Sequence, residues 1–352
     1  MQVTLWRDDV ALRHAVSAAH ERHDRRSRLF LRLRHGGVDG FGEVAPQNGA
    51  LNGDPSVLDV LDELSEVTIP QFLEVVSRES AVPSWTRIAR FAAARPASCV
   101  AVALVEMALL DWELRSSDQD VRSLWPKNFD TPMMATVSLI DVEDSWDVDE
   151  SAVRVRAKTS PGPVSGLALA RVRQATLPML LDFNCSARAD EQVLNQVDAL
   201  RGLADLVAVE QPYAAGNVID HATLAPRLDV PISLDEGVRT PRDLDQIHRY
   251  GAARMVCIKP ARVGGLANAR TMVQRARDVG LTCYLGGFFE SSFARHVHRL
   301  LAEHCVVEPS DLGDVATLEG LHRPEISWVD GGFGVAPSPE MLEKSTVLAT
   351  WS

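Results

Sequence analysis

The sequence predicts an α/β protein in which a parallel barrel of strands and helices is joined to a smaller α+β domain. Three observations lead to this fold class. The chain has 352 residues, which is more than one hydrophobic core usually organises. From about residue 133, short apolar runs alternate with amphipathic segments at a spacing of roughly 25 residues, which is typical of a parallel sheet. The earlier residues lack this alternation and contain instead a hairpin pattern and one long apolar segment.

The smaller domain is predicted to span residues 1–121. Within it, the segment RLFLRLR (28–34) alternates apolar and basic side chains, as a half-buried strand does. The turn signal HGGVDG (35–40) separates this strand from FGEVAP, so a β-hairpin is expected. Residues 96–115 have the length and spacing of a well-buried helix.

The barrel is predicted to span residues 122–320. About eight strand–helix units in about 200 residues favour closure into a barrel over an open sheet. An open dinucleotide-binding sheet is disfavoured because no GxGxxG follows the first strand. Residues 321–352 resume a β-rich pattern and are expected to return to the smaller domain. The expected strands are MMATVSL (133–139), AVRVRAK (152–158), PMLLDFN (178–184), LVAVEQP (206–212), PISLDEG (231–237), RMVCIKP (254–260), TCYLGGF (282–288) and CVVEPSD (305–311), and helices are expected at 189–202, 240–250 and 264–280.

Composition excludes several classes of partner. The net charge of −12 argues against a nucleic-acid or anionic-membrane partner. No apolar run is long enough to span a bilayer, and the first residues lack a signal-peptide pattern. The five cysteines occur singly, with no CxxC pair to indicate zinc, so we expect reduced structural thiols in a cytoplasmic protein.

Polar side chains follow successive strands at the end where a parallel barrel carries its function. Three consecutive strands end in an acid, namely Asp182, Glu210 and Asp235, and the next ends in Lys259. Acids at such positions can cap the following helices. Three of them at matching depth, with a lysine next, favour a site for a hard divalent cation such as Mg²⁺.

These motifs resemble those of the enolase superfamily, in its muconate-lactonizing-enzyme subgroup. LLDFN, VEQP, SLDEG and IKPARVGG are similar to its strand-end motifs, and GGFFESSFARHVHRLLA (286–302) to its seventh strand and the helix after it. In the smaller domain, RLFLRLRHGGVDGFGEVAP and VEMALLDWELR resemble the subgroup's capping-domain hairpin and linking helix. The resemblance covers nearly the whole chain and is strongest toward ortho-succinylbenzoate synthases and N-acylamino acid racemases. It implies a modified (β/α)8 barrel of the (β/α)7β type, with an α+β capping domain.

The resemblance also implies a mechanism. Asp182, Glu210 and Asp235 would bind one Mg²⁺, with Mn²⁺ as the alternative, and the enzyme would remove a proton next to a substrate carboxylate and stabilise the enediolate. Lysines on opposite faces would act as base and acid, and Lys259 fits one of these positions. The residues expected to contact a small carboxylate substrate are Arg154, Asn184, Glu290 and Ser291. Pairing of Glu290 with Arg295 is the alternative for that residue. The resemblance further implies a homo-oligomer.

Strand two departs from the family pattern of Lys-x-Lys. The register that we favour puts Arg154 and Arg156 at those two positions, and arginine is a poor general base because it keeps its proton. With a side-chain period of two, Lys158 faces the same way, one step nearer the mouth. A racemase needs a base on each face, so racemisation requires Lys158 in that role. With Lys259 as base and Arg156 as a fixed cation, one-base elimination or cycloisomerisation remains.

The leading hypothesis is therefore an Mg²⁺-dependent lyase or isomerase, most like ortho-succinylbenzoate synthase in dehydrating its substrate. N-acylamino acid racemisation and cycloisomerisation are the alternatives within the family. A barrel that has lost catalysis and serves as a binding protein is the alternative from another class, supported by the arginines on strand two. A phosphate-binding barrel is disfavoured because LGGFFES has only one glycine pair to cradle a phosphate.

Overall fold

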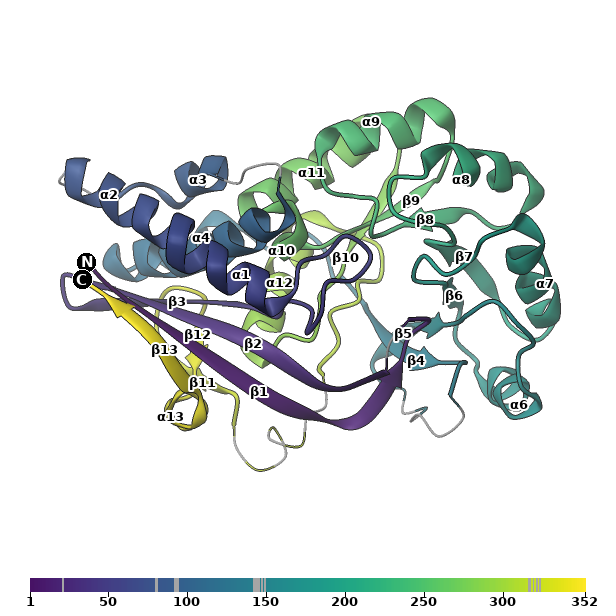
Figure 1. Cartoon of the computed structure of the whole chain (residues 1–352), viewed down its shortest axis with the longest axis horizontal. Helices are drawn as coiled ribbons and strands as arrows, with labels where there is room; N and C mark the ends of the chain where they lie inside the picture. Colours follow the sequence, from purple (N-terminus) through teal and green to yellow (C-terminus); the bar gives the residue numbers. More distant parts are fainter. Residues whose placement is uncertain are drawn as a thin grey trace.

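A computed structural model describes the chain from residue 1 to residue 352, apart from residues 21, 80–81, 92–94, 142–145, 147, 149, 316–317, 319, 321 and 323. An antiparallel sheet with helices on one side lies next to a curled parallel sheet with helices around its outside (Figure 1). None of the helices in the described part of the chain is long and apolar enough to cross a bilayer. All five cysteines are free thiols.

The parallel sheet is the predicted barrel. Seven strands follow one another in the order β10-β9-β8-β7-β6-β5-β4. They are β4 (Met133–Ser138), β5 (Ala152–Lys158), β6 (Met179–Asp182), β7 (Leu206–Glu210), β8 (Ile232–Leu234), β9 (Met255–Ile258) and β10 (Thr282–Leu285).

Two residues close the sheet. Ser310 forms a parallel bridge with Met133 at the β4 edge, and Asp311 forms one with Gly286 just after β10. The eighth expected strand, 305–311, is thus reduced to these two residues. Cys305, where this strand was expected to begin, still belongs to the preceding helix. The predicted (β/α)7β barrel is confirmed.

Helices follow the strands and cover the outside of the barrel (Figure 1). Those expected at 189–202, 240–250 and 264–280 are present as α7, α9 and α11, and α9 begins at a Thr240–Asp243 capping box and ends at Gly251 with φ of 66°. The outer helices are α6 (Gly166–Gln174), α7 (Asp190–Leu200), α8 (Val218–Leu224), α9 (Pro241–Tyr250), α10 (Pro260–Val263), α11 (Leu266–Asp278) and α12 (Ser292–Cys305), with a 3-10 turn at Ala225–Arg227.

The antiparallel sheet has the order β13-β1-β2-β3. Its strands are β1 (Gln2–Ser17), β2 (Arg22–His35), β3 (Val38–Val44) and β13 (Thr346–Trp351). The expected hairpin is β2–β3, turning at Gly36 and Gly37, whose φ values of 60° and 81° match a tight two-residue hairpin turn. Strand β1 was not predicted.

Helix α4 (Pro96–Ser116) is the predicted buried helix and packs on β3. Gly40 and Gly42 allow this close contact, because a Cβ on either would lie 2.3 Å from a carbonyl oxygen of α4. The other helices on this side are α1 (Val57–Glu63), a π-helical turn (Leu64–Thr68), α2 (Ile69–Glu79), α3 (Trp85–Ile88), a 3-10 turn (Ala89–Phe91) and, after α4, α5 (Val121–Leu124).

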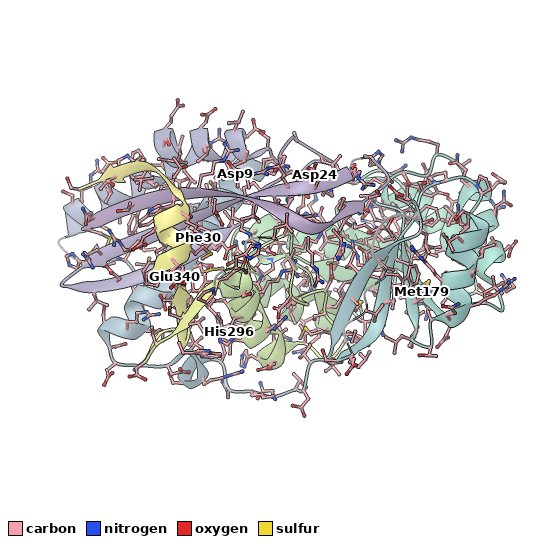
Figure 2. All side chains as sticks on the ribbon, turned by 90° about the horizontal axis from the view of Figure 1, so that it is seen from below. Asp9, Asp24, Phe30, Met179, His296 and Glu340 are labelled. Atoms are coloured by element: carbon pink, nitrogen blue, oxygen red, sulfur yellow. The ribbon has the colours of Figure 1, made fainter. Side chains whose placement is uncertain are left out.

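The C-terminal residues lie against the antiparallel sheet. Strand β13 pairs with β1, and α13 (Pro339–Lys344) places Met341 against Trp6 and Phe30. Figure 2 shows Phe30 on β2 beside the ribbon of α13, which carries Glu340. A small hairpin, β11 (Ile326–Trp328) and β12 (Val335–Pro337), precedes α13. The exact boundaries of the two predicted domains stay predictions.

Two buried carboxylates join the antiparallel sheet and its helices to the barrel. Glu106 of α4 accepts the backbone N–H groups of Leu266 and Ala267, which begin α11. Glu43 of β3 accepts the N–H groups of Ser291, at 2.6 Å, and Ala294, at 3.1 Å, at the start of α12. Each carboxylate supplies a cap to a barrel helix from a distant part of the chain.

Candidate active site

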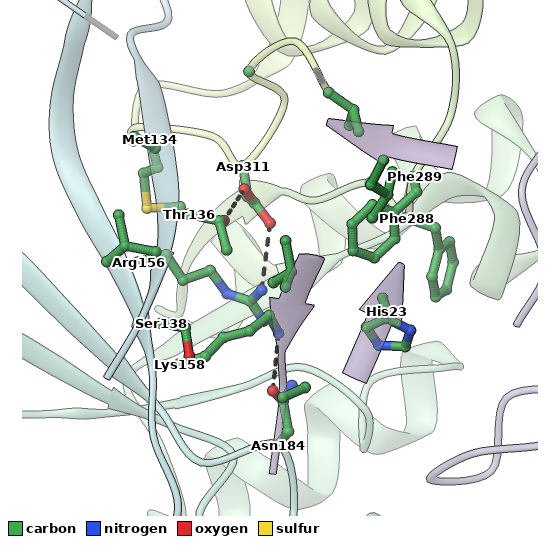
Figure 3. Close-up of a pocket in the computed structure, with 18 of the residues that line it drawn as sticks. His23, Met134, Thr136, Ser138, Arg156, Lys158, Asn184, Phe288, Phe289 and Asp311 are labelled. Atoms are coloured by element: carbon green, nitrogen blue, oxygen red, sulfur yellow. Dashed lines mark hydrogen bonds and ion pairs between the residues drawn. The ribbon is translucent and has the colours of Figure 1, made fainter. Parts of the chain in front are cut away.

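A cavity of about 490 Å³ lies over the carboxyl ends of the barrel strands. Its floor comes from the barrel, and its roof from the ends of β1 and β2, which reach over the mouth (Figure 3). Ser138 at the end of β4 donates a hydrogen bond to the carbonyl of Ser17 at 3.0 Å, which holds this roof to the barrel. His23 lines the roof with its ring 5.3 Å from that of Phe289, and burial lowers the pKa of His23 to about 3. His23 is therefore neutral near pH 7.

The three predicted acids converge below this cavity. Asp182 ends β6, and the strand register sets it beside Glu210 at the end of β7. Asp235 follows β8 directly. All three side chains are fully buried. Left-handed backbone at Asn184, with φ of 44°, directs its N–H to the Asp182 Oδ1 atom at 2.9 Å. Such strained residues concentrate at functional sites.

Arg156 lies where the three acids converge. Its Nη2 atom is 2.7 Å from Asp182 Oδ2 and 3.6 Å from Asp235 Oδ2, and it also donates to Glu210 Oε1. Burial disfavours the charge, but the carboxylates of Asp182 and Glu210 outweigh it and raise the pKa of Arg156 well above its ordinary value. Burial raises the pKa of Glu210 to about 7 in spite of this ion pair. Arg156 is a permanent cation here and cannot act as a base.

Lys158 ends β5 at the same depth as Asp182, with which the register pairs it. Its Nζ atom lies 2.9 Å from Asn184 Oδ1 and 3.3 Å from Asp182 Oδ2 (Figure 3). Burial lowers the pKa of Lys158, and the attraction of Asp182 offsets this only in part. Lys158 is thus the side chain of strand two that reaches the mouth as a potential base.

Lys259, which follows β9, has a different environment. Its Nζ atom donates to Asp235 Oδ2 at 2.9 Å and lies 4.8 Å from the centre of the Phe288 ring. Burial alone would lower the pKa of Lys259, but the attraction of Asp235 outweighs it and the pKa is raised. The two lysines line the same cavity with pKa values shifted in opposite directions.

The four predicted substrate contacts have different positions. Asn184 lines the cavity. Arg154 lies off it and pairs with Glu308 at 3.2 Å, because it is two steps deeper in β5 than Arg156. Glu290 pairs with Arg295 at 3.1 Å, which was the alternative considered for it. Ser291 is the N-cap of α12 and donates its hydroxyl to Glu43.

Several site residues were not predicted. Arg262 donates to Asp235 and binds both carboxylate oxygens of Asp54, at 2.9 and 2.7 Å, which links the Leu51–Asp54 turn to the barrel mouth. Tyr284 of β10 donates its hydroxyl to Glu210. Asp311 lines the cavity and accepts a hydrogen bond from Thr136 at 2.9 Å. Asp311 ends the eighth expected strand, so the strand-end rule that found the other acids applies to it as well.

As a donor set, three buried carboxylates at neighbouring strand ends suit a hard divalent cation such as Mg²⁺. In this conformation, however, the part of the chain that the structure describes contains no group of three or more His, Cys, Asp or Glu side chains arranged to hold a metal ion. The guanidinium of Arg156 lies between the three acids in this conformation and pairs with them. The assignment of Asp182, Glu210 and Asp235 as metal ligands stays a prediction, and it requires Arg156 to move.

Comparison with known proteins supports the same family. Residues 151–339 match the family model described as "Enolase C-terminal domain-like". The chain is 29% identical to an N-succinylamino acid racemase of Amycolatopsis sp. over 351 residues, covering 93% of this chain and 92% of the relative. It is 27% identical to an o-succinylbenzoate synthase of Bacillus subtilis (strain 168) over 349 residues, covering 94% and 90%. The fold matches an N-succinyl Arg/Lys racemase structure from Bacillus cereus with a TM-score of 0.80, at 17% identity over 99% of each chain.

Proposed function

The chain belongs to the enolase superfamily, a family of enzymes, and on that basis we propose that it removes a proton next to the carboxylate of a small substrate and then eliminates water, in a dehydration of the o-succinylbenzoate synthase type. The observation that carries this proposal is the pair of lysines, Lys158 and Lys259, that line one cavity. The cavity of about 490 Å³ suits a small molecule.

The two lysines belong to opposite sides of the barrel. Lys158 ends the second strand, β5, and Lys259 follows the sixth, β9, when the bridging residues 310–311 are counted as the eighth. Two strands that are four positions apart in an eight-stranded barrel lie on opposite sides of it. A substrate held between Lys158 and Lys259 would therefore meet one amine on each face.

The environments of the lysines support different roles. Lys158 has its pKa lowered, so its neutral amine is the more accessible base. Lys259, with its pKa raised by Asp235, is better suited to remain an ammonium that stabilises negative charge. This assignment reverses the expectation that Lys259 is the principal base, while Arg156 keeps its expected role as a charge only.

The dehydration can then proceed through one base. The amine of Lys158 takes the proton from the carbon next to the substrate carboxylate. The electron pair left on that carbon forms the double bond as the neighbouring hydroxyl leaves, and the Lys158 ammonium returns its proton to the hydroxyl, which departs as water. When a divalent cation is bound by Asp182, Glu210 and Asp235, it supplies positive charge for the substrate carboxylate.

N-acylamino acid racemisation is the second candidate, because the opposed lysines suit it as well. Lys158 would remove the proton from one face, and the Lys259 ammonium would deliver a proton to the other. Racemisation in both directions requires Lys259 to lose its proton in turn, and its pair with Asp235 at 2.9 Å opposes that loss in this conformation. This is the reason for preferring dehydration.

The test is exchange of the proton next to the carboxylate in deuterated buffer with Mg²⁺, using succinylated amino acids and cyclic hydroxy acids. We expect loss of substrate to a dehydrated product, and a fall of at least about a thousandfold in Lys158→Ala. Lys259→Ala should slow product formation to a similar extent. Exchange with inversion and no dehydration would favour the racemase. No exchange with any substrate of either class would favour the binding-protein alternative.

We also propose a homo-oligomer, which rests on the family resemblance alone. Light scattering at micromolar concentration tests it. A single species of 38.5 kDa, the mass of one chain, would contradict it.

A further inference from the structure

Arg156 separates the cavity from the acids below it. The guanidinium lines the cavity, whereas Asp182, Glu210 and Asp235 are fully buried. Figure 3 shows the Arg156 side chain extending from β5 across the floor of the cavity toward Lys158. Any ion that enters from the cavity therefore meets Arg156, together with Lys158, Lys259 and Arg262, before it meets the acids.

Behind the Arg156 side chain, no carboxylate oxygen of the three acids is free to bind a cation. Each of their six carboxylate oxygens already accepts a hydrogen bond or ion pair from the protein. The partners are Asn184 N–H, Arg156 and Lys158 for Asp182, Arg156 and Tyr284 for Glu210, and Arg262 and Lys259 for Asp235.

Most of the charge in the cluster is paired without a metal ion. Five carboxylates pair with five cationic side chains: Asp54, Asp182, Glu210, Asp235 and Asp311 with Arg156, Lys158, Arg239, Lys259 and Arg262. A sixth carboxylate, Glu236, accepts hydrogen bonds from Asn52 and Asn184, and burial raises its pKa to about 7. A dication added to this cluster would leave buried positive charge unpaired, which is costly. Arg156 cannot lose its proton, so it has to leave the acids instead.

Asp311 provides a second position for the Arg156 guanidinium. The Nη1 atom of Arg156 is 3.5 Å from Asp311 Oδ2, and Asp311 is oriented by the hydrogen bond from Thr136 (Figure 3). Asp311 is partly buried and lines the cavity, so a guanidinium turned toward it stays paired while it leaves the three acids.

We propose that Arg156 is a two-position gate, which competes with the divalent cation for Asp182, Glu210 and Asp235 and moves to Asp311 when the cation enters. This inference rests on the proposed function, because it assumes that these acids bind a metal. It also fixes an order of binding. The cation enters before the substrate, since a substrate in the cavity would cover Arg156 in its inner position.

Calorimetry with Mn²⁺ on metal-stripped protein tests the gate, because removal of the two partners has opposite effects. Arg156→Gln removes the competitor and should tighten Mn²⁺ binding by about tenfold or more. Asp311→Asn weakens the outer position and should loosen Mn²⁺ binding by about tenfold, although the substituted side chain is not a predicted ligand. The double variant should bind like Arg156→Gln alone, since Asp311 acts only through Arg156. Arg154→Gln, on the same strand but off the cavity, is the matched control and should bind like the wild type.

Four results would overturn the gate. Equal or weaker Mn²⁺ binding by Arg156→Gln, or unchanged binding by Asp311→Asn, would show that Arg156 does not compete, while the proposed metal site would stand. Failure of every variant and of the wild type to bind Mn²⁺ would remove both the gate and the metal part of the proposed function. If Arg156→Gln does not fold without metal, recovery of its thermal unfolding transition on adding Mn²⁺ supports the gate, and no recovery contradicts it.

Discussion

The barrel mouth and the joint between the antiparallel sheet and the barrel both bury carboxylates completely, yet they surround them with different partners. At the mouth, Asp182, Glu210 and Asp235 meet arginine, lysine and a tyrosine hydroxyl. At the joint, Glu43 and Glu106 accept mainly backbone N–H groups at the starts of helices. A side-chain cation can be displaced by another cation, whereas a backbone N–H cannot leave its helix. Complete burial therefore gives an ion cluster with exchangeable partners at the barrel mouth, and a hydrogen-bonded contact with fixed partners at the joint.

The pKa values reflect this difference. Burial raises the pKa of Glu106 to about 8 and that of Glu43 to about 7, because their hydrogen bonds compensate only in part. Burial acts on Asp235 too, but Arg262 and Lys259 outweigh it and lower its pKa. Asp235 is thus set for permanent charge and Glu106 and Glu43 for a pH-sensitive contact, whereas Glu210 at the mouth resembles the joint, because burial raises its pKa to about 7 as well.

The largest expected effect comes from Asp235→Asn at the mouth. The amide leaves Lys259 and Arg262 buried without their shared anion, so proton exchange on substrate should fall by about a thousandfold or more. Metal binding should weaken sharply and the circular dichroism spectrum should stay unchanged. Asp229→Asn is the control, because Asp229 is an exposed acid paired with Arg201. Wild-type exchange in Asp235→Asn would contradict the role of the mouth acids.

At the joint, Glu106→Ala should reduce stability by about 3 kcal/mol, since two buried N–H groups lose their acceptor. Urea unfolding measures this. Glu74→Ala, which removes an exposed ion pair with Arg78 on α2, should cost no more than about 0.5 kcal/mol. Equal losses for the two glutamates would mean that Glu106 does not fasten the joint.

The joint also predicts a pH dependence. The folded pKa of Glu106, about 8, lies above the ordinary value of 4.5, so the folded state holds the proton more tightly than the unfolded state between these values. The stability that this proton gives is complete below pH 4.5 and is lost as pH rises through 8. Between pH 6 and 9 Glu106 should contribute roughly 3 kcal/mol to the fall in the free energy of unfolding. Urea titrations at each pH measure the slope, which Glu106→Gln should reduce and not abolish, because the pKa values of Glu43 and Glu210 are raised to about 7 and fall in the same range; an unchanged slope in that variant would contradict the assignment.

The smallest effect is expected for Arg154→Met. Arg154 contacts Glu308 at 3.2 Å and lies off the cavity, so the loss should stay within about 1 kcal/mol and leave proton exchange unchanged. Steady-state kinetics and urea unfolding measure both. A large loss of activity would indicate that Arg154 contacts the substrate after all, as the sequence predicted.

The barrel acids could be predicted because each follows a short apolar run, so position along one strand was enough. The sequence alone could not predict how deep in the barrel each basic residue of β5 lies. Arg154, Arg156 and Lys158 share one face, and only the pairing of Lys158 with Asp182 shows which of them reaches the mouth. A single strand contains no information about the register of its neighbours.

Contacts between segments that are distant in the chain also could not be predicted from the sequence. Arg262 lies in the motif IKPARVGG, but its partner Asp54 is more than 200 positions away in the chain. Strand β1 escaped prediction because its sequence, QVTLWRDDVALRHAVS, breaks the simple alternation of a one-sided strand, and its last residues line the cavity over the barrel. The register of β1 with β2 is itself irregular between Ala11 and Val16.

The pairing of β1 with β13 has a consequence for biosynthesis. Val3 lies opposite Trp351, so residues near the two ends of the chain are neighbours in one sheet (Figure 1). During translation, β1 emerges from the ribosome before the barrel strands and stays exposed along one edge until β13 follows, after every barrel strand has been made. The sheet over the cavity can therefore be completed only after the barrel beneath it has been synthesised. A ribosome stalled before residue 346 would hold a chain with a finished barrel sequence and an open sheet edge, which is the point at which a chaperone would be needed most.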